Sequence, residues 1–220
     1  MSGTTRAPRG SVTAERVRDA AMSLADESGV AAVTIRSIAA RLGAKPMAVY
    51  HHVASKEEIL DAIIDEVFAQ VYRPAADGPW REELAARCRS MRQVLARHPW
   101  AVGLLETRRN PGPANLASHE SLLDVLMSAG FSLATTAHAA ALLDAFVFGF
   151  ALQEAMLVDL GLEADPAGLL EGMDLAATPR MLQFAREYVM REGYAFGDSF
   201  EVGLTIVLDG VQRLHDAPTG

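Results

Sequence analysis

Residues 33–60 read VTIRSIAARLGAKPMAVYHHVASKEEIL. This stretch contains two short helical patterns joined by a glycine turn. The first begins at Thr34 and ends at Gly43, a residue type that commonly stops helices. Its apolar face consists of Ile35, Ile38, Ala39 and Leu42. The second pattern covers 46–52 and carries proline in its first turn, where a missing N–H costs nothing. The stretch therefore predicts a helix-turn-helix.

Helical periodicity continues on both sides of this motif. Before it, apolar residues recur at helical spacing over 17–25, with Thr13 as the expected N-cap. After it, Ser55 and Glu58 have the spacing of a capping box that opens a helix over 56–72. The sequence therefore predicts one helix before the motif and another directly after it.

The remainder of the chain is also expected to be helical. A segment with two prolines and a glycine, 73–79, separates it from the first part. Helices are predicted at 80–98, 100–108, 114–129, from 132 or 135 to about 160, at 178–191 and at 198–214. Asp198 and Glu201 have capping-box spacing at the start of the last one. No segment has the alternation of a strand, so the predicted fold class is all-α.

Charge is distributed unevenly along the chain. The net charge is −8, but residues 1–56 contain eight basic and four acidic residues, which leaves them at +4 and the rest at −12. A protein that contacts DNA phosphates at one end needs positive charge only there. The asymmetry permits nucleic-acid binding by the N-terminal part without demonstrating it.

Cysteine content and the apolar runs indicate the compartment. The single cysteine, Cys88, excludes an internal disulfide and fits a reducing cytoplasm, and it is expected to be inert. No apolar run reaches the roughly 18 to 20 residues of a membrane span. Residues 1–11 contain two arginines and no apolar core, so we expect a disordered basic arm and not a signal peptide.

The motif residues resemble the signature of the TetR family of bacterial transcriptional regulators. The matching features are Thr34 at a helix start, Ile-Ala-x-x-Leu-Gly at 38–43, Tyr50 with Val53 after a two-residue step, and Lys56 opening the next helix. The resemblance implies a DNA-binding protein whose short second motif helix enters the major groove.

A weaker similarity extends over the second half of the chain. Trp80, the Ala-Gly-Phe-Ser at 129–132 and the long helix around Gly149 resemble the branch that contains the tetracycline repressor. The resemblance implies a three-helix DNA-binding domain at 1–56 and a larger effector-binding and dimerisation domain at 57–220, connected by the helix at 56–72.

The resemblance assigns DNA contacts residue by residue. The expected contacts are Thr34, Arg36, Lys45, Met47, Ala48, Tyr50, His51, His52 and Lys56. Lys45, Met47 and Ala48 occupy base-reading positions, Arg36 can reach a base or a phosphate, and the others occupy phosphate positions. Simple packing for Tyr50 and a solvated charge for Arg36 are the alternatives. Pro46 stands where the tetracycline-repressor branch has glutamine, which implies a different operator.

No metal or cofactor is predicted. His51 and His52 are adjacent, so on a helix their side chains point about 100° apart and cannot share an ion. The position of a metal-contacting histidine of the tetracycline repressor falls near Leu105, and Tyr72 occupies the position of a second. A magnesium–tetracycline ligand is therefore not expected, and an organic effector bound mostly by apolar contact is.

The resemblance places the effector between the helices of the larger domain. The candidate residues are Tyr72, Arg87, Met91, Leu95, Leu104, Leu105, Leu122, Leu126, Asp144, Phe146, Phe150 and Gln153. Tyr72, Arg87 and Asp144 are the polar ones that would orient a ligand. For each apolar residue, an ordinary core position is the alternative.

Dimerisation is assigned by the resemblance to the helices at about 133–160 and 198–214, which would form a four-helix bundle with their symmetry mates. The last helix carries an apolar stripe with two glycines that permit close approach: Leu204, Val207, Leu208, Val211 and Leu214, with Gly203 and Gly210. Packing of this stripe within one subunit is the alternative.

Together these features predict a ligand-responsive repressor that binds a palindromic operator as a homodimer and is released by a small organic effector. Effector binding would shift the population away from the state in which both recognition helices fit successive major grooves. An activator of the same family remains open. An all-α enzyme is the rival from another class, but its acidic pairs, Glu163/Asp165 and Glu171/Asp174, lack a partnering His or Cys. A purely structural protein would not explain the exposed surface at 45–52.

Overall fold

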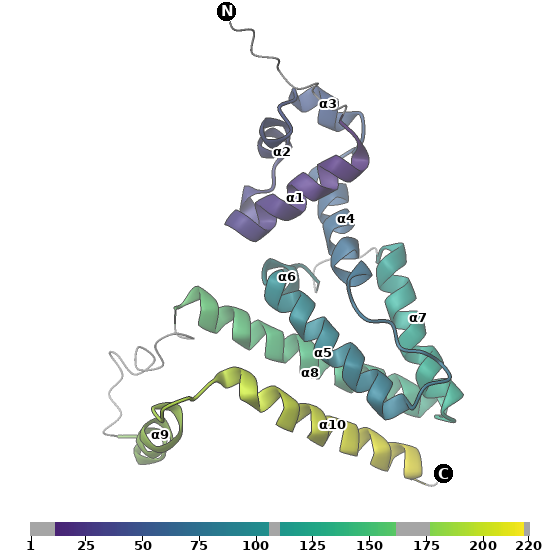
Figure 1. Cartoon of the computed structure of the whole chain (residues 1–220), viewed down its shortest axis with the longest axis vertical. Coiled ribbons are helices and arrows are strands. Elements are labelled where there is room, and N and C mark those ends of the chain that lie inside the picture. The colour runs from purple at the N-terminus through teal and green to yellow at the C-terminus, as the bar shows by residue number, and fades with distance from the viewer. Residues whose placement is uncertain (1–11, 106–110, 162–176, 218–220) are drawn as a thin grey trace, which may run out of the picture. The chain divides into compact units, whose positions relative to one another are not determined.

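The computed structural model describes residues 12–105, 111–161 and 177–217, and all regular structure in these ranges is helical (Figure 1). The helices are α1 (Ala14–Ser28), α2 (Ile35–Arg41), α3 (Pro46–Tyr50), α4 (Lys56–Ala69), α5 (Trp80–Arg97), α6 (Trp100–Leu105), α7 (Pro113–Ser128), α8 (Leu133–Asp159), α9 (Pro179–Phe184) and α10 (Ser199–Asp216). A π-helical turn at Ala185–Val189 continues α9. The predicted all-α class is confirmed.

Contacts divide the chain into two compact units. The first unit consists of Met1–Val71 and Arg97–His119, and the second of Tyr72–Ala96 and Glu120–Gly220. The first unit therefore contains α6 and the start of α7 in addition to α1–α4. The functional boundary at residue 56 stays a prediction.

The core of the first unit draws on every helix of the motif. Val17 and Ala21 of α1, Ile38 of α2, Val49 of α3 and Ile63 of α4 are at most 1% exposed. These residues follow the helical spacing in the sequence, so each helix turns one apolar face inward. From α6, Trp100 and Leu104 pack against the same cluster.

Caps formed by side chains fix several helix starts. Thr13 Oγ1 accepts the N–H of Arg16 at 3.2 Å, and Ser55 Oγ accepts the N–H of Glu58 at 3.2 Å. The Glu58 carboxylate reaches one residue further back than in the usual capping box and accepts the N–H of Ala54 at 2.5 Å. The predicted starts of α1 and α4 are confirmed, because these caps satisfy N–H groups that have no partner within the helix.

One predicted helix end and one predicted capping box are wrong. α4 ends at Ala69 instead of 72, because the chain turns after Gln70. Asp198 makes no capping bond at the start of α10, since its backbone is already helical at φ −64° and ψ −26° within the turn Phe196–Asp198. Glu201 instead accepts two hydrogen bonds from Arg89 on α5, at 2.9 and 2.7 Å.

In the second unit, α10 packs along α8. Leu204, Leu208 and Val211 are at most 4% exposed inside one subunit, and Phe200 is fully buried. A Cβ at Gly203 would lie 2.6 Å from Cε2 of Phe146, so glycine is required for this close approach. Most of the apolar stripe predicted for dimerisation is thus already covered within the chain, which was the alternative interpretation.

α8 is long and apolar enough to cross a membrane, judged by length and composition alone. Its most apolar 18-residue window has a mean hydropathy of 1.7, and 22% of that window is buried. The prediction that no apolar run reaches the length of a membrane span therefore understated the apolar character of this helix.

Burial makes Cys88 of α5 a testable feature of the core. The side chain is fully buried, and burial raises the pKa of its thiol to about 12. Since only the thiolate reacts with disulfide reagents, we expect the native protein to react with a thiol-specific disulfide reagent at about pH 8 far more slowly than the urea-unfolded protein. A native rate equal to the unfolded rate would contradict this burial.

The same shift predicts a pH dependence of stability. The folded protein keeps the thiol proton that the unfolded chain loses near its ordinary pKa of 9.0. The contribution of this group is therefore complete below about pH 9 and is lost as the pH rises towards 12. Urea titrations at several alkaline pH values should show a steeper loss of unfolding free energy for the wild type than for Cys88→Ala.

Candidate DNA-binding and effector sites

The surface of α3 is held outward by one buried residue. Val49 is fully buried in the core of the first unit, while Met47 and Tyr50 on the same helix are 65% and 49% exposed. A large thioether side chain and an aromatic ring thus face solvent from a helix of only five residues. Such exposed apolar groups are typical of contact surfaces.

The residues predicted to contact DNA lie on consecutive elements that pack around one core: the start of α2, all of α3 and the start of α4. The exposed ones are Thr34, Arg36, Lys45, Met47, Tyr50, His51 and His52, and the half-buried ones are Ala48 and Lys56. The helix-turn-helix therefore keeps every predicted contact out of the buried core.

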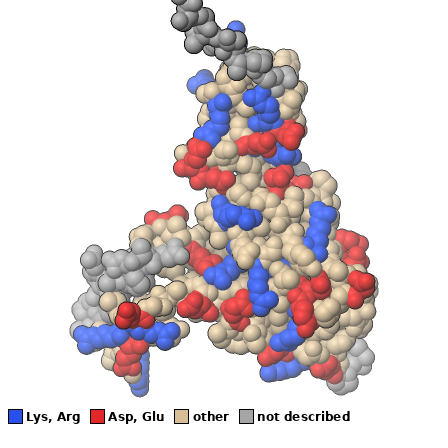
Figure 2. Space-filling model, in the orientation of Figure 1, with Lys and Arg blue, Asp and Glu red and all other residues tan. Residues whose placement is uncertain are grey.

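The basic side chains of the first unit fall into two groups, and Figure 2 shows basic and acidic groups interspersed on one of its faces. Arg41 donates to Glu27 at 2.7 Å, and Arg18 lies 3.2 Å from Glu66. By contrast, no ion pair is found within the described ranges for the predicted contacts Arg36, Lys45 and Lys56. All three are residues predicted to contact DNA, Lys45 at a base, Lys56 at a phosphate and Arg36 at either.

The Arg41–Glu27 pair joins the end of α1 to the end of α2. The hydrogen bond from Arg41 lowers the pKa of the Glu27 carboxyl, and the bond to Glu27 raises the pKa of Arg41. Both groups are solvent-exposed, so the pair contributes little to stability.

Thr34 has a structural task that limits its predicted DNA contact. Its Oγ1 accepts the N–H of Ser37 at 3.1 Å and lies 2.9 Å from the Ser37 hydroxyl, which in turn donates to the carbonyl of Ala32 at 2.7 Å. A phosphate contact by Thr34 would have to share the hydroxyl with this N-cap of α2.

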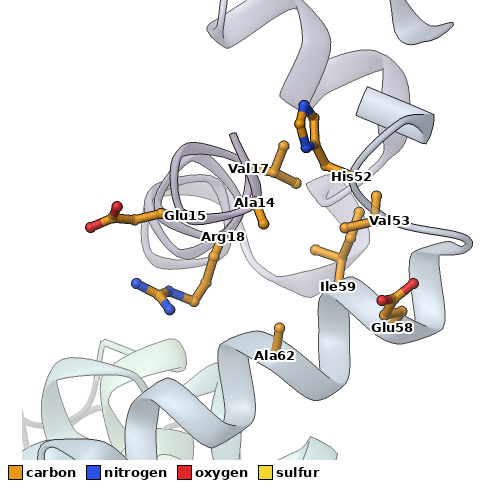
Figure 3. A pocket seen from close by; sticks show the side chains of 9 residues that line it. All are labelled: Ala14, Glu15, Val17, Arg18, His52, Val53, Glu58, Ile59 and Ala62. Carbon is orange, nitrogen blue, oxygen red and sulfur yellow. The ribbon is translucent and has the colours of Figure 1, made fainter. Parts of the chain in front are cut away.

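A cleft of about 460 Å³ lies between α1 and the start of α4 (Figure 3). Val17, Val53, Ile59 and Ala62 form its apolar part, and His52 stands at its edge. The imidazole therefore has open space on one side, which leaves it room to reorient towards a phosphate.

Arg87 and Asp144 pair in the second unit. Arg87 of α5 is 2% exposed, and its Nη1 donates to Asp144 Oδ1 of α8 at 2.9 Å. Its Nε is buried and makes no hydrogen bond in the described part of the chain. A buried guanidinium needs such a partner, because an unpaired charge away from water is strongly unfavourable.

The structure distributes the other predicted effector residues over different surroundings. Met91, Leu95, Leu122, Leu126 and Phe150 are buried on α5, α7 and α8, and Phe146 is half-buried. Leu105 is half-buried, and Leu104 packs on the core of the first unit. Gln153 is exposed and bonds to its own helix at Gly149 O, at 3.3 Å.

Tyr72 is exposed, and its hydrogen bonds fix the chain segment between α4 and α5. Its hydroxyl donates to Glu83 Oε2 at 2.8 Å, and its N–H donates to Ser90 Oγ at 2.9 Å. The bond to Glu83 raises the pKa of the Tyr72 phenol, and hydrogen bonds from Ala75 N–H and Tyr72 lower the pKa of the Glu83 carboxyl. Its phenol can therefore reach an effector only if this bond opens.

One group near Phe146 and Phe150 escaped the sequence analysis. Arg92 donates twice to Glu154, at 2.9 and 2.5 Å, and its guanidinium carbon lies 4.6 Å from the ring centre of Phe200 and 5.0 Å from that of Phe150. The cation thus closes an aromatic cluster formed by Phe146, Phe150, Phe196 and Phe200. The i, i+4 spacing of each phenylalanine pair was the available signal.

The burial of Arg87 makes Asp144 a sharp test of this part of the structure. Asp144→Ala leaves a buried guanidinium without its acidic partner and should lower the unfolding free energy by about 3 kcal/mol. Glu201→Ala breaks the exposed pair with Arg89 and should cost less than about 1 kcal/mol. Urea denaturation followed by circular dichroism measures both, and equal losses would refute the difference in burial.

Comparison with known proteins matches both halves of the chain. Residues 17–63 match the model described as "Bacterial regulatory proteins, tetR family", and residues 74–214 match "Tetracyclin repressor-like, C-terminal domain". An HTH-type transcriptional regulator of Saccharopolyspora erythraea is 37% identical over 139 residues, which cover 63% of this chain and 59% of that protein, so this match spans less than two thirds of its length.

A longer match and a solved structure agree with this assignment. The class A tetracycline repressor protein from transposon 1721 of Escherichia coli is 30% identical over 198 residues, 88% of either chain. The Streptomyces coelicolor TetR family protein ActR, crystallised with (S)-DNPA, superposes with a TM-score of 0.75 at 25% identity, covering 93% of this chain and 98% of ActR. The chain therefore belongs to the TetR family of transcriptional regulators, with both its N-terminal domain and its tetracycline-repressor-like C-terminal domain.

Proposed function

We propose that this chain is a ligand-responsive transcriptional repressor that binds a palindromic operator as a homodimer and is released by a small organic effector. The observation that carries the proposal is the α3 surface, where Met47 and Tyr50 are exposed beside Lys45, a cation with no acidic partner in the described ranges. It acts as a DNA-binding regulator in the cytoplasm and not as an enzyme.

On this surface, base reading and phosphate contact fall to different residues. Met47 and Ala48 offer apolar contact, for example with a thymine methyl group, and Lys45 offers a donor to a base. Tyr50, His51 and His52 lie one turn further along, where they would donate to phosphate oxygens and set the register. Arg36 and Lys56 add positive charge from the starts of α2 and α4.

Homodimerisation is supported by a solvent-exposed apolar face on α8. Leu142, Leu152 and Met156 are 47–55% exposed and follow helical spacing around Gly149, where a Cβ would meet nothing within 4 Å. This spacing places all four on one side of the helix. A second copy that packs here would remove the apolar side chains from water.

A matching face lies on α10, opposite the stripe that is buried within the subunit. Val202 and Ile206 are 63% and 65% exposed, and Gly210 one turn later has open space at its Cβ position. The dimer contact on α10 is therefore assigned to this outer face, not to the buried Leu204, Leu208 and Val211. Leu214 is 38% exposed and can extend it.

The effector is proposed to bind among α5, α7 and α8, near the buried Arg87–Asp144 pair. Apolar side chains from all three helices, such as Met91, Leu126 and Phe150, would supply most of the contact area, as in many small-molecule sites. The structural relative ActR has been crystallised with (S)-DNPA and with actinorhodin. Release from DNA then requires only that the effector binds the non-DNA-binding state more tightly.

DNA binding can be measured by fluorescence anisotropy on DNA upstream of the chain's own gene, at two salt concentrations. We expect saturable binding that is well above that to scrambled DNA and weakens with salt. A reporter gene behind the same DNA should lose expression when the protein is present. Weak, sequence-blind binding to this DNA and to sites selected from random DNA would contradict the proposal.

Two substitutions on α3 separate the proposed roles. Tyr50→Ala removes a phosphate donor and should weaken binding to all operator variants by a similar factor, roughly tenfold. Met47→Ala removes an apolar base contact and should change the ranking of operator variants at one position. Equal losses on every variant from both substitutions would refute this division.

Dimerisation is tested by a charge on the outer face of α10. Ile206→Asp places a carboxylate in the proposed interface and should shift the protein to monomer in sedimentation velocity runs at micromolar concentration. Leu133→Asp is the matched control, because Leu133 is 74% exposed on α8 but lies about 180° around the helix from Leu142. A dimer that survives Ile206→Asp would place the interface elsewhere.

A further inference from the structure

The carboxylate of Asp26 joins α1 to the segment where α5 ends and α6 begins. Its Oδ1 lies 2.7 Å from His98 Nδ1 and accepts the indole N–H of Trp100 at 2.6 Å. An ionised carboxylate can only accept, so His98 donates from Nδ1. One oxygen thus receives two donors that flank Pro99, and α6 starts immediately after this proline.

Asp26 is unfavourable for the helix that carries it. It lies in the last turn of α1, where the helix dipole presents its negative end and destabilises a carboxylate. The next acid, Glu27, is bound by Arg41 within the helix-turn-helix. Asp26 therefore does not stabilise its own helix. Its hydrogen bonds instead fix the start of α6.

The other ring nitrogen of His98 contacts the end of α4. Its Nε2 lies 3.2 Å from Nε2 of Gln70, the C-cap of α4, and Oε1 of Gln70 accepts Arg97 Nη2 at 3.1 Å. His98 is only 8% exposed. The polar network thus joins the ends of α1, α4 and α5 at the start of α6, beside the apolar contacts of Trp100 with the core.

A second carboxylate fixes the segment that follows α6. Asp65 of α4 accepts the N–H of Asn115 at 2.9 Å and so caps the first turn of α7. A Cβ on Gly112 would collide with the Asp65 carboxyl, so the backbone approaches α4 as closely as it can. Within the first unit, Asp26 of α1 and Asp65 of α4 therefore bind the segment 97–119 near its start and near its end.

From this arrangement we infer that Asp26 is the positioning residue through which α5 and α6 control the orientation of α1. The inference rests on the proposed function and adds its regulation. Any displacement at the end of α5 reaches His98 and Trp100 within a few residues, and their donors transmit it to Asp26. Because α1 packs against α2 and α4, it carries the displacement into the helix-turn-helix.

Coupling between two sites is reciprocal, so operator binding can report on it without a known effector. We would measure hydrogen–deuterium exchange of the full-length protein with and without operator DNA selected from random sequences. In the wild type, DNA should slow exchange in 34–56 and, through Asp26, by about fivefold in 80–105. Asp26→Ala should keep the first effect and lose the second.

Glu27→Ala is the matched control, because it removes the same charge from the same turn but leaves His98 and Trp100 bound. It should retain both effects. If Asp26→Ala does not fold, Asp26→Asn replaces it and should reduce the effect in 80–105, since an amide oxygen is a weaker acceptor than a carboxylate. Unchanged protection of 80–105 in the Asp26 variant, or none there in the wild type, would overturn the inference.

A DNA-free measurement separates this inference from the proposed function. Trp80→Phe leaves Trp100 as the only tryptophan. Asp26→Ala in that background should shift the Trp100 emission to longer wavelength and lower its anisotropy, whereas Glu27→Ala should not. If no DNA is bound but the emission shifts, the contact exists and the regulator assignment fails. An unchanged emission overturns the role of Asp26.

Discussion

The structure of the proposed DNA-binding surface depends on the burial of Val49. A five-residue helix is far too short to be stable alone, since helix formation has a costly nucleus. The helicity and direction of α3 therefore come from Val49, which inserts fully into a core shared with Ile38 and Ile63. Met47 and Tyr50 point outward only because Val49 points inward. The apolar core and the exposed surface are two sides of one short helix.

The sequence predicted those elements whose signals are local. Thr13 and Ser55 cap helices as their residue types suggest, and the helix-turn-helix follows from its apolar spacing and glycine turn. The predicted capping box of Asp198 and Glu201 does not form, because a preceding turn makes the backbone of Asp198 helical and Arg89 donates to Glu201. Such competition between a cap and a distant partner depends on tertiary structure, which periodicity along one helix does not contain.

The site residues follow the same rule: those with a signal in their own helix could be predicted, and those defined by contacts between helices could not. The exposed face of α3 and the Arg87–Asp144 pair combine residues that the sequence had singled out. For Arg92, the spacing of the phenylalanines indicates an aromatic cluster but not that a cation from α5 packs on it. The apolar stripe on α10 shows the limit most clearly. Leu204, Leu208 and Val211 were predicted to meet a second subunit, with packing inside one subunit as the alternative, and they are buried within the chain itself. A sequence pattern indicates that a face is buried but not which partner buries it.

The way the chain is divided has a consequence for protein engineering. The polypeptide passes between the two compact units at residues 71/72, 96/97 and 119/120, so the first unit is not one continuous stretch of sequence. A chimera that joins residues 1–71 to another regulator would leave behind Trp100 and Leu104, and Asp26 would lose both of its donors. Functional hybrids of this regulator therefore need the α6 segment to travel with the helix-turn-helix, or a foreign α6 that offers equivalent groups.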